Sequence, residues 1–157
     1  MLVDVGRVEA SGLASLTELV AWVLDAGAGS RWCNLDLEVD EDQHSGDSVL
    51  FGFLAARGPS SPFATVMSAE RGKRPRPPEI GVQHRAGPKS VAQLASAGVT
   101  VPEGWFVRQD HPRRGLVVEV GEDTSAPTLT SWVLEVMFAL NRAETTGAFR
   151  FEIHEAS

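Results

Sequence analysis

The sequence contains one stretch whose acidic residues are spaced as cation ligands could be. Carboxylates recur at short intervals between residues 36 and 47, namely Asp36, Glu38, Asp40, Asp42 and Asp47. Alternating carboxylates of this kind supply the oxygen ligands of a calcium loop. That loop needs glycine at its sixth position, where this chain has Glu41, and the alternating Leu35, Leu37 and Val39 favour a strand. We therefore interpret the stretch as the solvated face of a strand and predict no calcium site.

The other chemistry-bearing residues form no catalytic pattern in the sequence. The four histidines, His44, His84, His111 and His154, form no HxH or HExxH pair, so only the fold could bring them to one metal. The GxSxG, Walker and GxGxxG patterns are missing from the sequence. Cys33 is the only cysteine, which excludes an intramolecular disulfide, and we expect it to be a small buried hydrophobe. The sequence predicts no catalytic residue, metal or cofactor, and we expect the protein not to be an enzyme.

Basic residues are concentrated in the middle of an acidic chain. The net charge is −7, yet residues 71–114 contain nine basic and three acidic residues, so this segment carries +6 and the remainder −13. The segment could attract an acidic partner, with Arg74 and Arg76 as candidate contacts, or it could neutralise the protein's own acidic strands. The acidic total disfavours nucleic acid as a partner. The "PRPP" segment has PxxP spacing but lacks a flanking basic residue at the usual offset, which favours a stiff loop over an SH3 ligand.

Length and composition predict one globular domain over residues 1–157, and the helices and strands expected below make it an α+β domain. The chain is 43% hydrophobic and 22% charged, which is enough apolar material for one core. No apolar run approaches the ~18 residues that a membrane span needs, and the first residues lack the pattern of a signal peptide. We therefore expect a cytoplasmic protein without a membrane segment.

Hydrophobic periodicity predicts the elements of this domain. Two major helices are expected near residues 15–26, starting at a capping box of Ser15 and Glu18, and near 126–143, with Pro127 in the first turn. Strands are expected at 33–39, 48–56, 62–69, 115–120 and 148–154, with 48–56 and 62–69 as a hairpin. Shorter patterns predict an exposed connection at 71–79, an edge strand at 80–85, a helix at 89–98 and a strand at 104–110. The prediction is a twisted antiparallel sheet of five to seven strands, packed by an N-terminal helix and a long C-terminal helix.

The long C-terminal helix has more apolar residues than one buried stripe requires. Its core stripe is expected to consist of Leu129, Trp132, Val133, Val136, Met137 and Leu140. Leu134 and Phe138 remain, one turn apart, on the polar face. They are covered either by the connection 71–79 or the N-terminal helix, or by a partner peptide or a second subunit. This makes both residues candidates for partner binding.

One segment resembles a known family. "LASAGVTVPEGWFVR" combines a short helix, a glycine, a proline and a strand led by Trp105, and a long helix follows it. This order is similar to the actinobacterial peptide-binding chaperone domains, which are grouped with the type III secretion chaperones and the YbjN proteins. The resemblance covers residues 63–143, with the helix 15–26 in the expected place. It implies an α+β sandwich that binds peptides, has no cofactor and often dimerises, and it adds Trp105 to the candidate binding residues.

These observations lead to three function classes. We expect a non-enzymatic protein- or peptide-binding module, chaperone-like, with a polypeptide partner and a homodimer as one possible form. The alternative is an immunity protein that neutralises a basic toxin through the acidic strand "DLEVDEDQ". A small enzyme would require titratable residues to converge in the fold, which the sequence cannot display.

Overall fold

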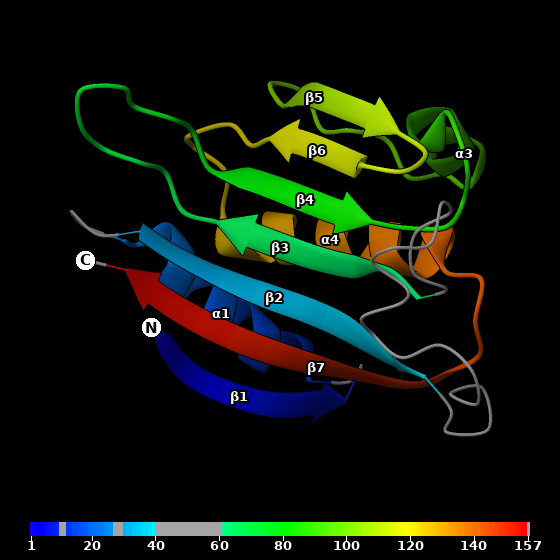
Figure 1. Ribbon diagram of the computed structural model, residues 1–157, viewed down its shortest axis with the longest axis horizontal. Coiled ribbons are helices and arrows are strands. Elements are labelled where there is room, and N and C mark those ends of the chain that lie inside the picture. Colours follow the sequence, from blue (N-terminus) through cyan, green and yellow to red (C-terminus); the bar gives the residue numbers. More distant parts are fainter. Residues whose placement is uncertain (10–11, 27–29, 40–60, 157) are drawn as a thin grey trace.

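The chain forms an α+β fold with one antiparallel sheet. The computed structural model describes residues 1–9, 12–26, 30–39 and 61–156. In these residues the strands are β1 (Leu2–Glu9), β2 (Ser30–Val39), β3 (Phe63–Met67), β4 (Glu79–Gln83), β5 (Phe106–His111), β6 (Gly115–Glu119) and β7 (Thr145–Ala156). The helices are α1 (Leu13–Leu24), α3 (Ser90–Ser96) and α4 (Ala126–Leu140). The seven strands lie in the order β1-β7-β2-β3-β4-β6-β5 (Figure 1).

The C-terminal strand β7 occupies a place between the first two strands of the chain. It pairs antiparallel with β1 on one side and with β2 on the other. In β1, Gly6 lies opposite Phe151, whose ring covers the glycine so closely that a Cβ atom there would overlap it. The absence of a side chain at Gly6 therefore lets the aromatic ring of β7 lie across its neighbour strand.

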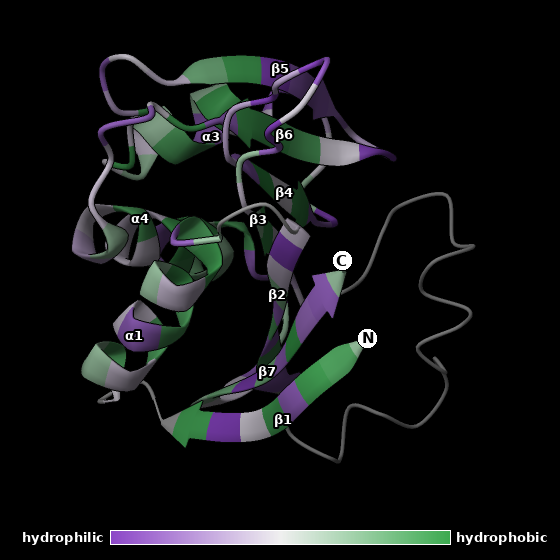
Figure 2. Ribbon diagram, turned by 90° about the vertical axis from the view of Figure 1, so that its left-hand side faces the viewer, coloured by the Kyte–Doolittle hydropathy of each residue, from purple (hydrophilic) through white to green (hydrophobic). Residues whose placement is uncertain are grey.

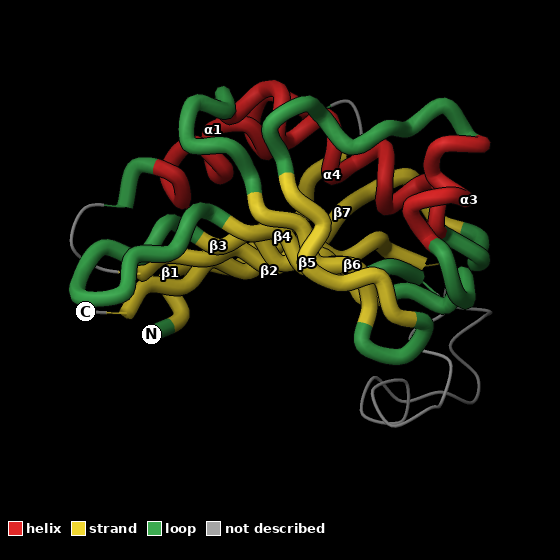
Figure 3. The backbone as a smooth tube through the Cα atoms, turned by 90° about the horizontal axis from the view of Figure 1, so that it is seen from above, coloured by secondary structure: helices red, strands yellow, loops and turns green. Residues whose placement is uncertain are grey.

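The helices lie together on one side of the sheet. Figure 3 shows α1 and α4 above the strands, and Figure 2 shows the same two layers from the side. Because strand side chains alternate between two faces, Cys33, Leu35 and Leu37 of β2 are buried under the helices. They belong to one buried cluster that includes Leu16 of α1 and Met137 of α4. In the described part of the chain, no helix is long and apolar enough to cross a membrane.

Most of the predicted elements are confirmed. Both major helices lie within a few residues of their predicted bounds, and all six residues of the expected α4 stripe are buried. The short helix ends before Gly98, which has a φ of +82° and so a backbone conformation that suits glycine. The predicted strands with clear alternation correspond to β2, β3, β6 and β7, and the predicted strand 104–110 overlaps β5. The expected strand 48–56 lies outside the described residues.

Three details of the prediction are wrong. Helix α1 begins two residues earlier than the proposed capping box, with Gly12 as N-cap and no side-chain cap, and Ser15 instead donates its backbone N–H to the Gly12 carbonyl. The strand expected at the edge, β4, is internal, between β3 and β6, because its Ile80 and Val82 are buried in the core. The edge strand β1 was not predicted, since its short apolar pattern is interrupted by Asp4, Gly6 and Arg7.

Candidate functional site

The face of the sheet opposite α1 and α4, called here the open face, carries the strongest candidate site. The described part of the chain places no helix on this face (Figure 3). Opposite residues of antiparallel strands point to the same side, so the registers assign its members. They include Leu2, Val5, Arg7, Trp32, Asn34, Asp36, Glu38, Phe63, Thr65, Met67, Glu79, Gln83, Phe106, Gln109, Val117, Glu119, Arg150, Glu152 and His154. The open face therefore combines aromatic rings, Met67 and several charged groups.

A stacked ring pair lies at one end of the open face, near the start of β2 and the ends of β3 and β7. The Trp32 and His154 rings are 4.9 Å apart between centroids and nearly parallel, at 3°. Met67 lies directly opposite Trp32 on β3 and is 37% exposed. Next to this row, Thr65 donates its hydroxyl to Asn34 Oδ1 at 2.9 Å. This part of the face is therefore partly apolar; Thr65 and Asn34 are bonded to each other, whereas His154 Nε2 has no hydrogen-bond partner among the described residues.

A pocket of about 370 Å³ lies beside this ring pair, where β3, β4, β5 and β6 meet the connection 70–77. Its lining consists of Met67, Ser68, Glu70, Arg76, Pro77, Glu79, Arg108 and Glu119. Apolar contact is offered by Met67 and Pro77, and every other lining residue is polar or charged. The pocket has the mixed character of a site for a side chain with an apolar stem and a polar end.

The charges of the pocket are incompletely balanced. Glu79 and Glu119 lie directly opposite each other on β4 and β6, an arrangement that is unfavourable for like charges. Arg108 Nε is 3.0 Å from Glu119 Oε1, so the charge of Glu119 is balanced by an ion pair. Arg76 pairs with Glu70 at 3.7 Å, and Glu79 has no ion pair among the described residues. The pocket lining therefore contains three carboxylates and two guanidinium groups.

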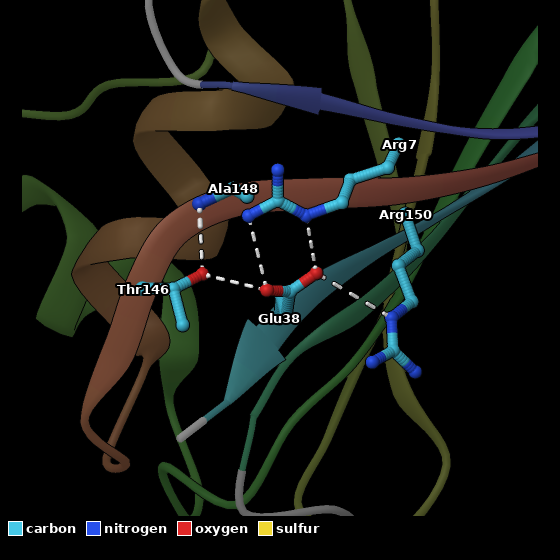
Figure 4. Close-up of polar contacts among 5 residues, drawn as sticks. All are labelled: Arg7, Glu38, Thr146, Ala148 and Arg150. Atoms are coloured by element: carbon cyan, nitrogen blue, oxygen red, sulfur yellow. Dashed lines mark hydrogen bonds and ion pairs between the residues drawn. The ribbon is translucent and has the colours of Figure 1, made fainter. Parts of the chain in front are cut away.

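A second charged group lies at the other end of the open face (Figure 4). Glu38 of β2 receives two hydrogen bonds from Arg7 of β1, at 2.7 and 3.1 Å, and one from Thr146 at 3.2 Å. Arg150 Nε is 3.7 Å from the same carboxylate. The hydrogen bond from Arg7 is the main cause that holds the pKa of Glu38 below its usual range, and the opposing effect of burial is smaller. This group joins β1, β7 and β2, and it balances the charge of Glu38 within the protein.

The candidate residues on the long helix lie on the other side of the sheet. Leu134 is 8% exposed and belongs to the core cluster, and α4 packs beside α1. Phe138 is 44% exposed, and its ring meets Phe149 edge-on at 5.5 Å. The two side chains therefore do not form a jointly exposed ridge, and only Phe138 offers surface to a partner.

The other candidate residues are dispersed. Trp105 donates its indole N–H to Thr124 at 3.0 Å and meets Trp132 edge-on at 5.1 Å, so it fixes the loop before β5 against α4. Arg74 is exposed in the connection 71–76, as expected for that segment. Only Arg76 reaches the pocket of the open face. The structure thus brings one of the five candidate residues to the site and leaves four elsewhere.

The key residues of the open face were missed by sequence reasoning. The alternation of β2 assigned Asn34, Asp36 and Glu38 to a solvated face, and the same alternation extended back would have included Trp32. Glu79 and Glu119 face each other because of the register between β4 and β6, and no pattern in the sequence predicts that register.

Metal binding finds no support in the part of the chain that the structure describes. There, no three His, Cys, Asp or Glu side chains are grouped as metal ligands would be, while His44 and residues 40–47 lie outside it.

Comparison with known proteins finds no matching family model, no matching curated protein and no matching solved structure. The resemblance to the peptide-binding chaperone domains therefore stays a prediction.

Proposed function

We propose that this protein is a non-enzymatic module that binds a polypeptide partner on its open face. The observation that carries the proposal is a sheet face on which the described residues place no helix, with its apolar side chains and its pocket. A module of this kind agrees with the predicted chaperone-like role in the cytoplasm, and a homodimer would be one form of it.

The residue types of the open face support this function. Protein interfaces are enriched in aromatic residues, methionine and arginine. The open face carries Trp32, Phe63 and Met67, and Arg108 lines the pocket beside them. Phe106 at the edge of this face is 60% exposed, and Met67 is 37% exposed. Such apolar surface is unfavourable in water at about 25 cal/mol per Å², and a partner that covered it would remove this cost.

The toxin-neutralising alternative has one supporting observation. The carboxylate excess at Glu79 would attract a basic partner, as an immunity protein does. Against it, the charge of Glu38 is balanced by Arg7 and Arg150. The two functions differ in the partner, which is an extended polypeptide in the first and a folded basic protein in the second.

A pair of matched variants tests the proposal. The partner is first identified by affinity capture with the intact chain, and its binding is then measured by calorimetry with purified components. We expect the double variant Met67→Gln/Phe106→Gln to weaken binding about tenfold or more, because truncated interface anchors commonly cost over 1 kcal/mol, with the melting temperature nearly unchanged. The control Phe138→Gln changes a similarly exposed ring on the helical side and should bind as the parent does. Loss of binding in the control alone would refute the open face as the site.

A further inference from the structure

The loop between β4 and α3 has a constrained backbone. Two of its residues have positive φ angles, Gly87 at +85° and Lys89 at +59°. A left-handed conformation is unfavourable for lysine, so it persists only where surrounding contacts hold it. The loop 85–89 is therefore a segment that depends on its tethers.

Three side chains provide those tethers. Gln93 of α3 donates its amide to the carbonyl oxygens of Ala86 and Pro88, at 2.8 and 3.0 Å. Asp110 of β5 accepts hydrogen bonds from the backbone N–H groups of residues 90 and 91, at 3.0 and 3.1 Å, and from the hydroxyl of residue 90 at 2.6 Å. His84, at the end of β4, accepts the N–H of Ala86 at its Nδ1 atom, at 3.2 Å. Of these three residue types, only histidine has an ordinary pKa near neutral pH.

The hydrogen bond to Ala86 fixes the protonation state of His84. An acceptor nitrogen carries no proton, so the ring is neutral and its proton lies on Nε2. The side chain is 1% exposed, and Nε2 has no hydrogen-bond partner among the described residues. His84 is thus a buried neutral imidazole whose second nitrogen is unsatisfied.

The surroundings of His84 disfavour its charged form. Burial is the main cause that lowers its pKa below the ordinary value of 6.5, Asp110 opposes this shift, and Arg142 adds to it. Arg142 is held nearby, since its guanidinium donates to Gln93 Oε1 at 3.1 Å. On α3, the residues nearest this loop, Ser90 and Gln93, are uncharged. Two further basic residues lie in the loop itself: Lys89, which is exposed, and Arg85, which follows His84 in the chain.

We propose that His84 is a proton-operated latch, which holds the loop 85–89 and α3 against the sheet when neutral and releases them when protonated. A proton on Nδ1 would convert the acceptor into a donor that faces the N–H donor of Ala86. The same proton would place a cation in a buried site near Arg142. Both changes favour a form in which the loop moves away and the imidazolium reaches water.

Amide hydrogen exchange of the intact protein tests the latch. Protection factors of the α3 amides, which are corrected for intrinsic exchange, are compared at about pH 7.5 and about pH 5. We expect the α3 opening equilibrium to rise by up to about tenfold per pH unit below 6.5, because the open form binds one more proton. Protection of β2, at the centre of the sheet, should change much less.

Two variants identify the titrating group. Asn at position 84 places Oδ1 where Nδ1 was and does not titrate, so His84→Asn should abolish the pH dependence of α3. His111 also accepts backbone N–H groups at Nδ1, from Arg113 and Arg114 at 3.1 Å, in the β5–β6 turn, so His111→Asn should keep the parent's pH dependence. Equal α3 protection at both pH values in the parent would overturn the latch, as would a His84→Asn variant that kept the dependence. If this variant does not fold, NMR of the His84 ring in the parent protein is used to follow its protonation with pH. A His84 ring that is protonated over a different pH range from the loss of α3 protection would overturn the latch.

Discussion

Leu134 and Phe138 lie one turn apart on α4, yet the protein covers them differently. Leu134 is part of the shared core of both long helices and the sheet, whereas Phe138 keeps one edge against Phe149 and exposes the rest. Spacing along a helix determines that two side chains share a face, but the neighbouring element determines whether the face meets water. On α4, Leu134 lies in the core cluster, whereas Phe138 is 44% exposed.

The difference between these two residues is measurable. Leu134→Ala should lower the free energy of unfolding by about 2–5 kcal/mol, because it leaves a cavity in a packed core. Phe138→Ala should cost clearly less, on the order of 1–2 kcal/mol, since its side chain is 44% exposed. Urea denaturation of both variants provides the comparison, and equal costs would contradict the assigned burial.

At the scale of elements, the two long helices begin in different ways. Helix α4 has Ser125 as its N-cap, whose hydroxyl oxygen accepts the N–H of Thr128 at 3.3 Å, and a proline follows in the first turn. Helix α1 starts at Gly12 without a side-chain cap. The serine that the sequence offers there, Ser15, is an exposed residue of the first turn.

Replacement of each serine by alanine tests these helix starts. Ser125→Ala should destabilise the protein by about 1 kcal/mol, because it leaves a backbone N–H of α4 without its acceptor. Ser15→Ala should be neutral or slightly stabilising, because alanine has the higher helix propensity and no cap is lost. Thermal unfolding of the two variants distinguishes the cases. A similar loss of stability in Ser15→Ala would show that Ser15 caps the helix after all.

Elements with strong periodicity could be predicted from the sequence, and those defined by distant partners could not. The α4 stripe and the alternation of β2 are local patterns, so they identify a helix and a strand on their own. Strand β1 has a weak pattern, and its conformation depends on pairing with β7 at the far end of the chain. For the same reason, the candidate site could be predicted only in part. Arg76 was among the candidate residues, but the opposition of Glu79 to Glu119 and of Trp32 to Met67 depends on the strand register, which the sequence does not reveal.

At the scale of the whole molecule, Cys33 lies near the middle of the sheet, on the helix-covered side. Its neighbours in register are Val66 of β3 and Ile153 of β7. Burial raises the pKa of its thiol to about 12, and a hydrogen bond from the Val66 backbone opposes this only in part. The group that reacts with alkylating reagents, the thiolate, is therefore scarce in the folded protein.

The reactivity of this thiol should report unfolding of the entire domain. At about pH 8, iodoacetamide should modify Cys33 far more slowly in the native protein than in urea, and the rate should follow global unfolding. Mass spectrometry of samples quenched over time measures the modification. Native labelling at the rate of a free thiol would contradict the burial of Cys33.

The position of β7 between β1 and β2 has a consequence for biosynthesis. The ribosome makes β1 and β2 first, but the strand that joins them is not available until residues 145–156 have left the exit tunnel. Throughout most of translation, both early strands therefore keep an unpaired edge, a state in which nascent chains can associate with one another. A premature stop before residue 145 would remove the strand with which β1 pairs among the described residues, so such fragments should be recovered as aggregates or degraded rather than as a smaller folded domain.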